Sequence, residues 1–195
     1  MAVAVGYWLW VAFIATWNIA MIWTGKARSR GASTISLAYF AAYVVGFGLL
    51  FAGVIGPIRH LLPPDALRPL WDGAPASDVA LMAVEGTAFA FAWWARIHLG
   101  RLWSGMLTLR DGHRVVDSGP YRLVRHPIYT GFIGASWTLA LLVATPAALA
   151  GALVLTVVMT VKARTEEALL RREIDRNAYD DYARRTPMLV PFAPK

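Results

Sequence analysis

The feature that most constrains the fold of this chain is an uncharged run of 34 residues, 128–161. As a single helix the run would be about 51 Å long, whereas the hydrocarbon layer of a membrane is about 30 Å thick. Thr145-Pro146 lies at its middle, and proline disfavours helix at the residue before it. The run therefore predicts two short helices, residues 128–144 and 146–161, folded as a hairpin within a membrane.

Composition indicates that this hairpin is part of a larger membrane protein. Hydrophobic residues make up 57% of the chain and charged residues 16%, whereas soluble domains are about 45–50% apolar and about 25% charged. A chain of 195 residues cannot hide such an excess in one core, so lipid must cover part of its surface. Three more apolar segments, residues 5–23, 35–58 and 79–95, bring the expected number of transmembrane helices to five.

The distribution of basic residues predicts an orientation. Three lie in the first loop, six in the third loop and eight in the tail, so 17 of the 19 Lys and Arg residues fall on one side. Because Lys and Arg gather in cytoplasmic loops, the N-terminus is expected outside and the tail in the cytoplasm. The net charge of +7 is then explained by topology, and no nucleic-acid partner is expected.

We therefore expect an all-α integral membrane protein with five transmembrane helices, the last two forming the hairpin. Residues 162–182 are polar but keep apolar side chains four residues apart, which predicts a C-terminal cytoplasmic amphipathic helix. The expected organisation is three membrane helices in residues 1–95 and a cofactor-binding region in residues 96–195.

Several kinds of chemistry are excluded or disfavoured by the sequence. The absence of cysteine removes disulfides, thiolate metal sites and cysteine nucleophiles. The four histidines lack the spacing of zinc proteases, so no metal site is expected. Gly46-Phe47-Gly48 lacks the third glycine of a dinucleotide loop, which favours helix packing over nucleotide binding.

Two charged clusters are the candidates for a functional site. Arg125-His126 precedes Pro127, a residue suited to the first turn of a helix, and Glu166-Glu167 follows the hairpin. The hairpin brings its two ends together, so a helix N-terminus and both signs of charge are expected to meet there, as a zwitterionic cofactor requires. The alternatives are an interfacial belt of Tyr and Arg and a solvated helical turn. Glu85, an acid within a span, is either functional or a partnered structural acid.

Several motifs in the second half of the chain together resemble one known family. In chain order they are Arg101-Leu102-Trp103-Ser104, His113-x-Val115-Val116-x-Ser118-Gly119-Pro120-Tyr121, Arg125-His126-Pro127-x-Tyr129-x-Gly131, Glu166-Glu167 and Tyr179-x-x-Tyr182-x-x-Arg185-x-Pro187. With this order and spacing, the chain resembles the isoprenylcysteine carboxyl methyltransferase family of membrane enzymes. The arginine-histidine-proline block is also similar to that of phospholipid methyltransferases.

The resemblance implies an S-adenosylmethionine-dependent methyltransferase that releases S-adenosylhomocysteine. The residues implied to bind the cofactor are His113, Arg114, Val115, Val116, Tyr121, His126, Pro127, Ile128, Tyr129, Glu166 and Glu167. The resemblance also implies that Lys162 helps to hold the methyl acceptor, and we expect Arg125 and Arg185 to orient an anionic acceptor with it. Lys162 stands where the family has arginine; it keeps the charge but lacks the bidentate fork that fits a carboxylate.

The expected acceptor is a lipophilic or prenylated carboxylate that reaches the site from the membrane. A carboxylate is ionised at neutral pH and needs no general base, so we expect direct methyl transfer. The alternatives are an amine headgroup or a thiol on the same scaffold, an NADPH-dependent membrane reductase, and a transporter or anchor without enzymatic activity.

Overall fold

The computed structural model describes residues 1–20, 33–103, 115–173 and 176–193, and these residues form helices and loops without a β-strand. The α-helices are α1 (Ala2–Ile19), α2 (Ser33–Leu50), α3 (Gly56–Arg59), α4 (Pro75–Leu99), α5 (Pro127–Val143), α6 (Pro146–Glu173) and α7 (Arg176–Arg185). Three short 3₁₀ turns, η2 (Pro64–Leu67), η3 (Gly100–Leu102) and η4 (Gly119–Arg122), lie between them.

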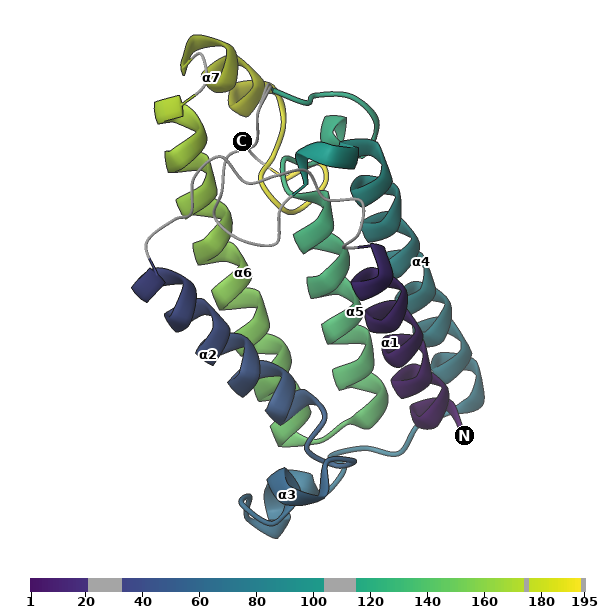
Figure 1. The fold of residues 1–195 in the computed structure, drawn as a ribbon. Coiled ribbons are helices and arrows are strands. Elements are labelled where there is room, and N and C mark those ends of the chain that lie inside the picture. The colour runs from purple at the N-terminus through teal and green to yellow at the C-terminus, as the bar shows by residue number, and fades with distance from the viewer. Residues whose placement is uncertain (21–32, 104–114, 174–175, 194–195) are drawn as a thin grey trace.

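The long helices form one bundle (Figure 1). The antiparallel pair α5–α6 lies at its centre, α1 and α4 pack against α5, and α2 packs along α6. The short α3 lies at one end of the bundle, and α7 lies at the other end, beside the start of α5 (Figure 1). The described chain is therefore all-helical, as the sequence predicts.

The predicted break at Thr145-Pro146 is confirmed. Helix α5 ends at Val143, Ala144 adopts a left-handed conformation with φ of 57°, and α6 begins at Pro146. The Thr145 hydroxyl accepts a hydrogen bond from the Ala148 N–H at 3.2 Å, which caps an otherwise unpaired donor of the first turn. The sharp reversal sets the two helices side by side in opposite directions.

Two boundaries differ from those expected from the sequence. The helix expected over residues 35–58 ends at Leu50, because a turn at residues 51–54 interrupts it. Helical structure resumes only with α3, which has Pro57 in its first turn. The amphipathic helix expected over residues 162–182 is not one separate element. Helix α6 continues without a break to Glu173, since residues 162–173 contain good helix formers and neither Gly nor Pro, and α7 follows as its own helix.

Among the residues that the structure describes, two helices, Ala2–Ile19 and Pro146–Arg172, are long and apolar enough to cross a membrane, and Leu37–Leu50 and Pro127–Val143 are shorter apolar helices. Helix α6 has 28 residues and is about 42 Å long, longer than a hydrocarbon layer of about 30 Å. Its charged residues all lie in the part from Lys162 onward. If α6 spans a bilayer, its charged end is the part that the hydrocarbon layer cannot hold.

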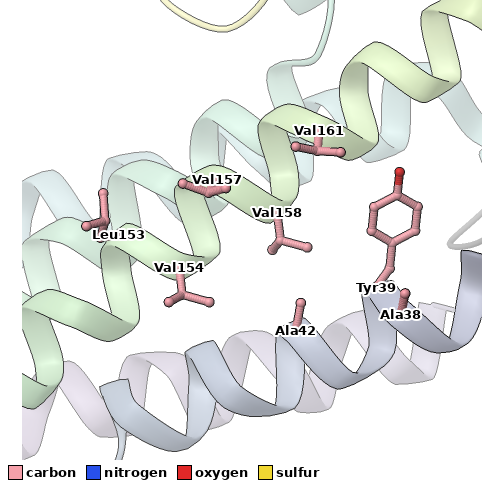
Figure 2. A pocket seen from close by; sticks show the side chains of 8 residues that line it. All are labelled: Ala38, Tyr39, Ala42, Leu153, Val154, Val157, Val158 and Val161. Carbon is pink, nitrogen blue, oxygen red and sulfur yellow. The ribbon is translucent and has the colours of Figure 1, made fainter.

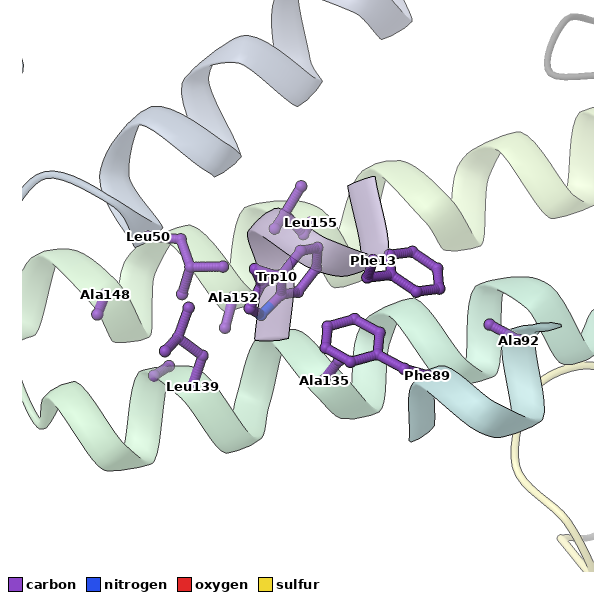
Figure 3. Close-up of a cluster of buried hydrophobic side chains, with 11 residues drawn as sticks. Trp10, Phe13, Leu50, Phe89, Ala92, Ala135, Leu139, Ala148, Ala152 and Leu155 are labelled. Atoms are coloured by element: carbon purple, nitrogen blue, oxygen red, sulfur yellow. The ribbon is translucent and has the colours of Figure 1, made fainter. Parts of the chain in front are cut away.

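An aromatic core joins the helices (Figure 3). Trp10 of α1 is fully buried, and its ring centroid lies 5.0 Å from that of Phe89 and 5.5 Å from that of Phe47, with the rings edge to face. Such pairs contribute about 0.5–1.5 kcal/mol beyond the area that they bury. The core therefore fixes α1 and α2 against the central helices.

Glu85 of α4 is buried in this core rather than in the charged clusters. A Cβ atom at Gly6 would lie 3.2 Å from its Oε2. The Trp10 indole interacts with the carboxyl group, yet within the described part of the chain neither group has a hydrogen bond of normal length. The acid lies beside Leu139 and Leu142 of α5, about 20 Å along the helix from His126.

Gly131 sets the distance between α5 and α4. A Cβ atom at this position would lie 2.5 Å from the Ala88 carbonyl oxygen and 2.8 Å from the Ala92 Cβ. The backbone atom cannot rotate away as a flexible side chain can, so only glycine permits this separation. The start of α5 and its neighbouring residues are held in place by this contact.

We expect Gly131→Ala to lower the free energy of unfolding by about 1–3 kcal/mol, because the methyl group overpacks the helix contact. Gly134→Ala is the matched control: its Cβ would lie 3.5 Å from the Ala88 Cβ, an ordinary contact. Alanine also favours helix over glycine by about 1 kcal/mol, so the control variant should be as stable as the native protein or more stable. Denaturation in mixed micelles measures both, and equal behaviour of the two variants would contradict the packing account.

Candidate active site

The hairpin brings the two charged clusters together, as the sequence predicts. Arg125 and His126 lie just before α5, and Glu166 and Glu167 lie on the charged end of α6. The antiparallel pairing of α5 and α6 places the first pair beside the second, at the end of the bundle that carries α7 (Figure 1).

Glu167 is the centre of a network of hydrogen bonds and ion pairs. Arg125 Nε donates to its Oε1 at 2.7 Å and Nη2 to its Oε2 at 3.3 Å. His126 Nε2 lies 3.2 Å from the same Oε1, and Arg171 Nη2 lies 3.6 Å from Oε2. Both carboxylate oxygens are therefore bound by side chains of the protein itself.

The network keeps Glu167 ionised. Burial by itself raises the pKa of this carboxyl group, but the hydrogen bonds from His126 and Arg125 outweigh it and lower the pKa to about 2. Glu167 is thus a carboxylate at any physiological pH, and Arg125 has a permanent counter-charge.

Arg125 also binds the end of α7 and the chain that follows it. Its Nη1 donates to the carbonyl oxygen of Ala183 at 2.9 Å and to that of Thr186. Its backbone N–H donates to Pro187 O at 2.9 Å, and the Thr130 hydroxyl donates to Leu189 O at 2.6 Å. Residues 186–189 are therefore fastened to the start of α5, a contact that sequence reasoning missed because backbone carbonyls leave no pattern in the sequence.

His126 lies between the two glutamates. Its Nε2 faces Glu167, as described above, and its Nδ1 lies 3.7 Å from Glu166 Oε2. The ring stacks in parallel on that of Tyr129, with centroids 5.5 Å apart. The imidazole therefore fixes the position of Glu166 relative to the network around Glu167.

Glu166 is the acid that faces the start of α5. The Tyr129 hydroxyl donates to Glu166 Oε1 at 2.6 Å, and Lys162 Nζ lies 3.9 Å from the same oxygen. Its side chain is 22% exposed, against 6% for Glu167. Of the two acids, Glu166 is accordingly the one that a bound molecule can reach.

Lys162 is a buried amine with aromatic neighbours. Its side chain is 9% exposed, and Nζ lies 5.5 Å from the ring centroid of Tyr129 and 5.9 Å from that of Tyr43. Aromatic faces attract a cation at such distances. Tyr43 comes from α2, a helix that the motifs did not implicate, so its presence beside Lys162 could not be inferred from them.

The remaining predicted residues are spread around this centre. Tyr121 is buried, and its carbonyl oxygen accepts a hydrogen bond from the Tyr182 hydroxyl at 2.6 Å. Val116 packs in the same hydrophobic cluster as Tyr121 and Ile128.

Arg185 is 67% exposed and lies 3.7 Å from Asp117, outside the Glu166–Glu167 network. Pro127 is buried, and Val115 is half-buried. His113 and Arg114 lie outside the residues that the structure describes.

The start of α5 adds backbone donors to the site. Pro127 occupies the first helical position, where a missing N–H has no cost. The N–H groups of Ile128 and Tyr129 have no acceptor within the helix because they belong to its first turn. Together with the helix dipole they favour an anion, while Glu166 favours a cation. The set fits a ligand that carries both charges, which S-adenosylmethionine does.

The described part of the chain is a bundle of helices that includes candidate membrane spans. At one end of this bundle lies a charged site that can bind a zwitterion. Residues 80–172 match the sequence profile of the isoprenylcysteine carboxyl methyltransferase family. The match covers just under half of the chain, and over this region the chain is similar to that family.

Three curated proteins show the range of its relatives. The chain is 35% identical over 128 residues to the cobalt-zinc-cadmium resistance protein CzcN of Cupriavidus metallidurans, covering 62% of this chain and 53% of that protein. It is 33% identical over 101 residues to protein-S-isoprenylcysteine O-methyltransferase B of Arabidopsis thaliana, covering 50% and 51%. It is 44% identical over 75 residues to methanethiol S-methyltransferase 2 of Bradyrhizobium diazoefficiens, covering 36% and 26%. The matches thus span about half or less of each relative.

Proposed function

We propose that the protein is a membrane methyltransferase that moves a methyl group from S-adenosylmethionine to a lipophilic carboxylate. The observation that carries the proposal is the pairing of Glu166 and Lys162 at the start of α5. An accessible carboxylate and a buried amine share one oxygen contact there, so one site offers counter-charges for both substrates. The two relatives named as methyltransferases support the reaction class.

In this proposal Glu166 binds the amino group of S-adenosylmethionine, and the backbone N–H groups at the start of α5 bind its carboxylate. His126 and Tyr129 hold Glu166 in place through the contacts described above. Val115, Val116, Tyr121, Pro127 and Ile128 form apolar walls, and His113 and Arg114 complete the cofactor site. Bound there, S-adenosylmethionine supplies an electrophilic methyl group.

Lys162 orients the acceptor. A carboxylate acceptor is already ionised at neutral pH, so the protein need not remove a proton. The residues must instead hold the acceptor carboxylate in line with the methyl group and exclude water from the site. These are the contributions of proximity and of an enclosed site to catalysis. The ammonium group of Lys162, flanked by Tyr43 and Tyr129, provides the charge for this task.

Arg125, Glu167 and Arg185 serve the site indirectly. The guanidinium of Arg125 binds Glu167 and the backbone carbonyls of Ala183 and Thr186. Arg125 therefore holds these groups in place beside the site and does not itself bind the acceptor. Glu167 holds Arg125 and His126. Arg185, exposed beside Asp117, attracts an anionic substrate to this end of the bundle.

We further propose the topology that the charge distribution predicts: five transmembrane helices, α1, α2, α4, α5 and α6, with the N-terminus outside. The charged end of α6, α7 and the site then face the cytoplasm. Residues 1–95 supply three of the membrane helices, and residues 96–195 supply the cofactor site. S-adenosylmethionine reaches the site from water, and the acceptor reaches it from the lipid.

The test is methyl transfer from methyl-tritiated S-adenosylmethionine by the purified protein in nanodiscs that contain a bacterial lipid extract. Mild base releases labelled methanol from a methyl ester but leaves N-methyl and S-methyl products intact. We expect base-labile product. A base-stable product would show that the methyl acceptor is an amine or a thiol and not a carboxylate. A protein that binds S-adenosylhomocysteine yet labels nothing in the extract would contradict the proposed lipophilic acceptor.

A further inference from the structure

The segment that follows α7, residues 186–193, carries no charge and emerges from the bundle as it proceeds. Thr186 and Pro187 are buried, whereas Val190 is 63% exposed and Phe192 is 93% exposed. The later part of this segment therefore presents apolar side chains to the surroundings of the protein.

This segment runs along the start of α5 (Figure 1). The backbone N–H groups of residues 125–126 donate to the carbonyl oxygens of residues 187–188, at 2.9 and 3.1 Å. The Thr130 hydroxyl donates to Leu189 O at 2.6 Å. The points of contact thus advance from the residues before α5 to its first turn, in the direction in which the helix itself runs.

The position of this contact relates the exposed side chains to the membrane. Helix α5 contains no charged residue, and in the proposed topology it enters the bilayer from the side of the charged site. Residues beside its first turn then lie near the boundary between headgroups and acyl chains. Val190 and Phe192 follow directly after this contact, so at that depth they meet lipid.

A tight turn places Phe192 at the tip of the segment. The Ala193 N–H donates to Val190 O at 3.2 Å, so Pro191 and Phe192 are the central residues of the turn. Phe192 has a φ of 63°, a conformation that turns usually give to glycine or asparagine and that is rare for a bulky side chain. Strain of this kind persists where the surroundings offset it, and transfer of an aromatic ring from water to lipid is favourable.

The charges around the segment favour the same partner. Among the described residues, the exposed charges at this end of the bundle are mostly arginines. They are Arg122, Arg164, Arg172, Arg184 and Arg185, against Asp117 and Asp181. Anionic lipid headgroups attract basic residues that lie close to the membrane surface.

We propose that the turn at residues 190–193 is a membrane anchor that inserts Val190 and Phe192 among the lipids beside the charged site. The inference rests on the topology in the proposed function and adds a partner, the surface of an anionic leaflet. Because residues 187–189 are bonded to the start of α5, insertion of the turn also fixes the chain that binds Arg125.

The absence of cysteine from the chain allows a nitroxide label to be attached at one introduced cysteine in the full chain. The variants are Phe192→Cys, Asp181→Cys and Val157→Cys, in nanodiscs of phosphatidylcholine and phosphatidylglycerol. Asp181 is 59% exposed on α7 and serves as the reference for water, and Val157 is 55% exposed on α6 and serves as the reference for lipid. Electron paramagnetic resonance measures collisions of each label with oxygen, which concentrates in lipid, and with a polar nickel chelate, which stays in water. We expect oxygen collisions to dominate at positions 192 and 157 and nickel collisions to dominate at position 181.

A second set of variants tests the phenylalanine ring itself. The label is attached through Val190→Cys, with Phe192 either retained or changed to serine. Burial of a phenylalanine side chain favours insertion by a factor of about ten or more, so Phe192→Ser should lower the inserted population of the label about tenfold. Ala193→Ser is the matched control, because it adds the same hydroxyl to the same turn without removing a ring, and it should leave the label in lipid.

The outcomes separate the anchor from the other proposals. Nickel collisions as frequent at position 192 as at position 181, or equal effects of Phe192→Ser and Ala193→Ser, would overturn the anchor. A label at position 157 that is in water would overturn the topology and the anchor with it. Titration of the same proteins with S-adenosylhomocysteine is independent of depth. Insertion at position 192 without cofactor binding would support the anchor and contradict the methyltransferase proposal, and cofactor binding with position 192 in water would do the reverse.

Discussion

Glu167→Ala is expected to lower the free energy of unfolding by about 3 kcal/mol, because it leaves the buried guanidinium of Arg125 without its counter-charge. The Arg125 side chain is only 12% exposed, so water cannot replace the lost carboxylate. The pKa of Glu167 near 2 lies below the ordinary value of 4.5, so this stabilisation is present above about pH 4.5 and is lost as the pH falls towards 2. Denaturation of both proteins in mixed micelles at neutral pH measures the difference.

Asp181→Ala is the control for this prediction. Asp181 pairs with Arg184, but their side chains are 59% and 71% exposed, and such surface pairs contribute about 0–1 kcal/mol. We expect little change in this variant. Similar losses of stability in the two variants would show that burial of the Arg125–Glu167 pair has no special role.

Glu166→Gln is expected to weaken the binding of S-adenosylhomocysteine by about ten- to a hundredfold, since a hydrogen bond to a charged group contributes about 1.5–3 kcal/mol. The amide keeps the shape of the side chain and can still contact Tyr129, so the protein should remain folded. Calorimetric titration of the native and variant proteins measures the change.

Asp65→Asn provides the same chemical substitution away from the site. Asp65 is 83% exposed and lies in η2, between α3 and α4, so the affinity for S-adenosylhomocysteine should not change. A Glu166→Gln variant that binds S-adenosylhomocysteine as tightly as this control would show that Glu166 does not bind the cofactor.

The hairpin and the meeting of its charged ends could be predicted from sequence because both depend on local signals. Thr145-Pro146 interrupts a run too long for one span, and an antiparallel hairpin must bring its ends together. The extension of α6 to Glu173 was harder to predict. Polarity changes sharply at Lys162, whereas helix continuity depends on propensity, and residues 162–173 favour helix throughout.

Other features depend on contacts between distant segments and leave no periodic signal. Gly131 belongs to a motif, but only the packing of α5 on α4 shows that its missing side chain is what matters. The binding of residues 186–189 to Arg125 is made through carbonyl oxygens that every residue has. An apolar groove between α2 and α6 (Figure 2) arises because Ala38 and Ala42 of α2 lie opposite α6, a pairing that requires the tertiary structure.

The central claim, that the charged site at the start of α5 binds S-adenosylmethionine, is tested most directly by calorimetric titration of the purified native protein with S-adenosylhomocysteine, with NADPH titrated in parallel. The account predicts saturable binding of one S-adenosylhomocysteine per chain and no binding of NADPH. Folded protein that binds NADPH instead, or that binds neither, would contradict it.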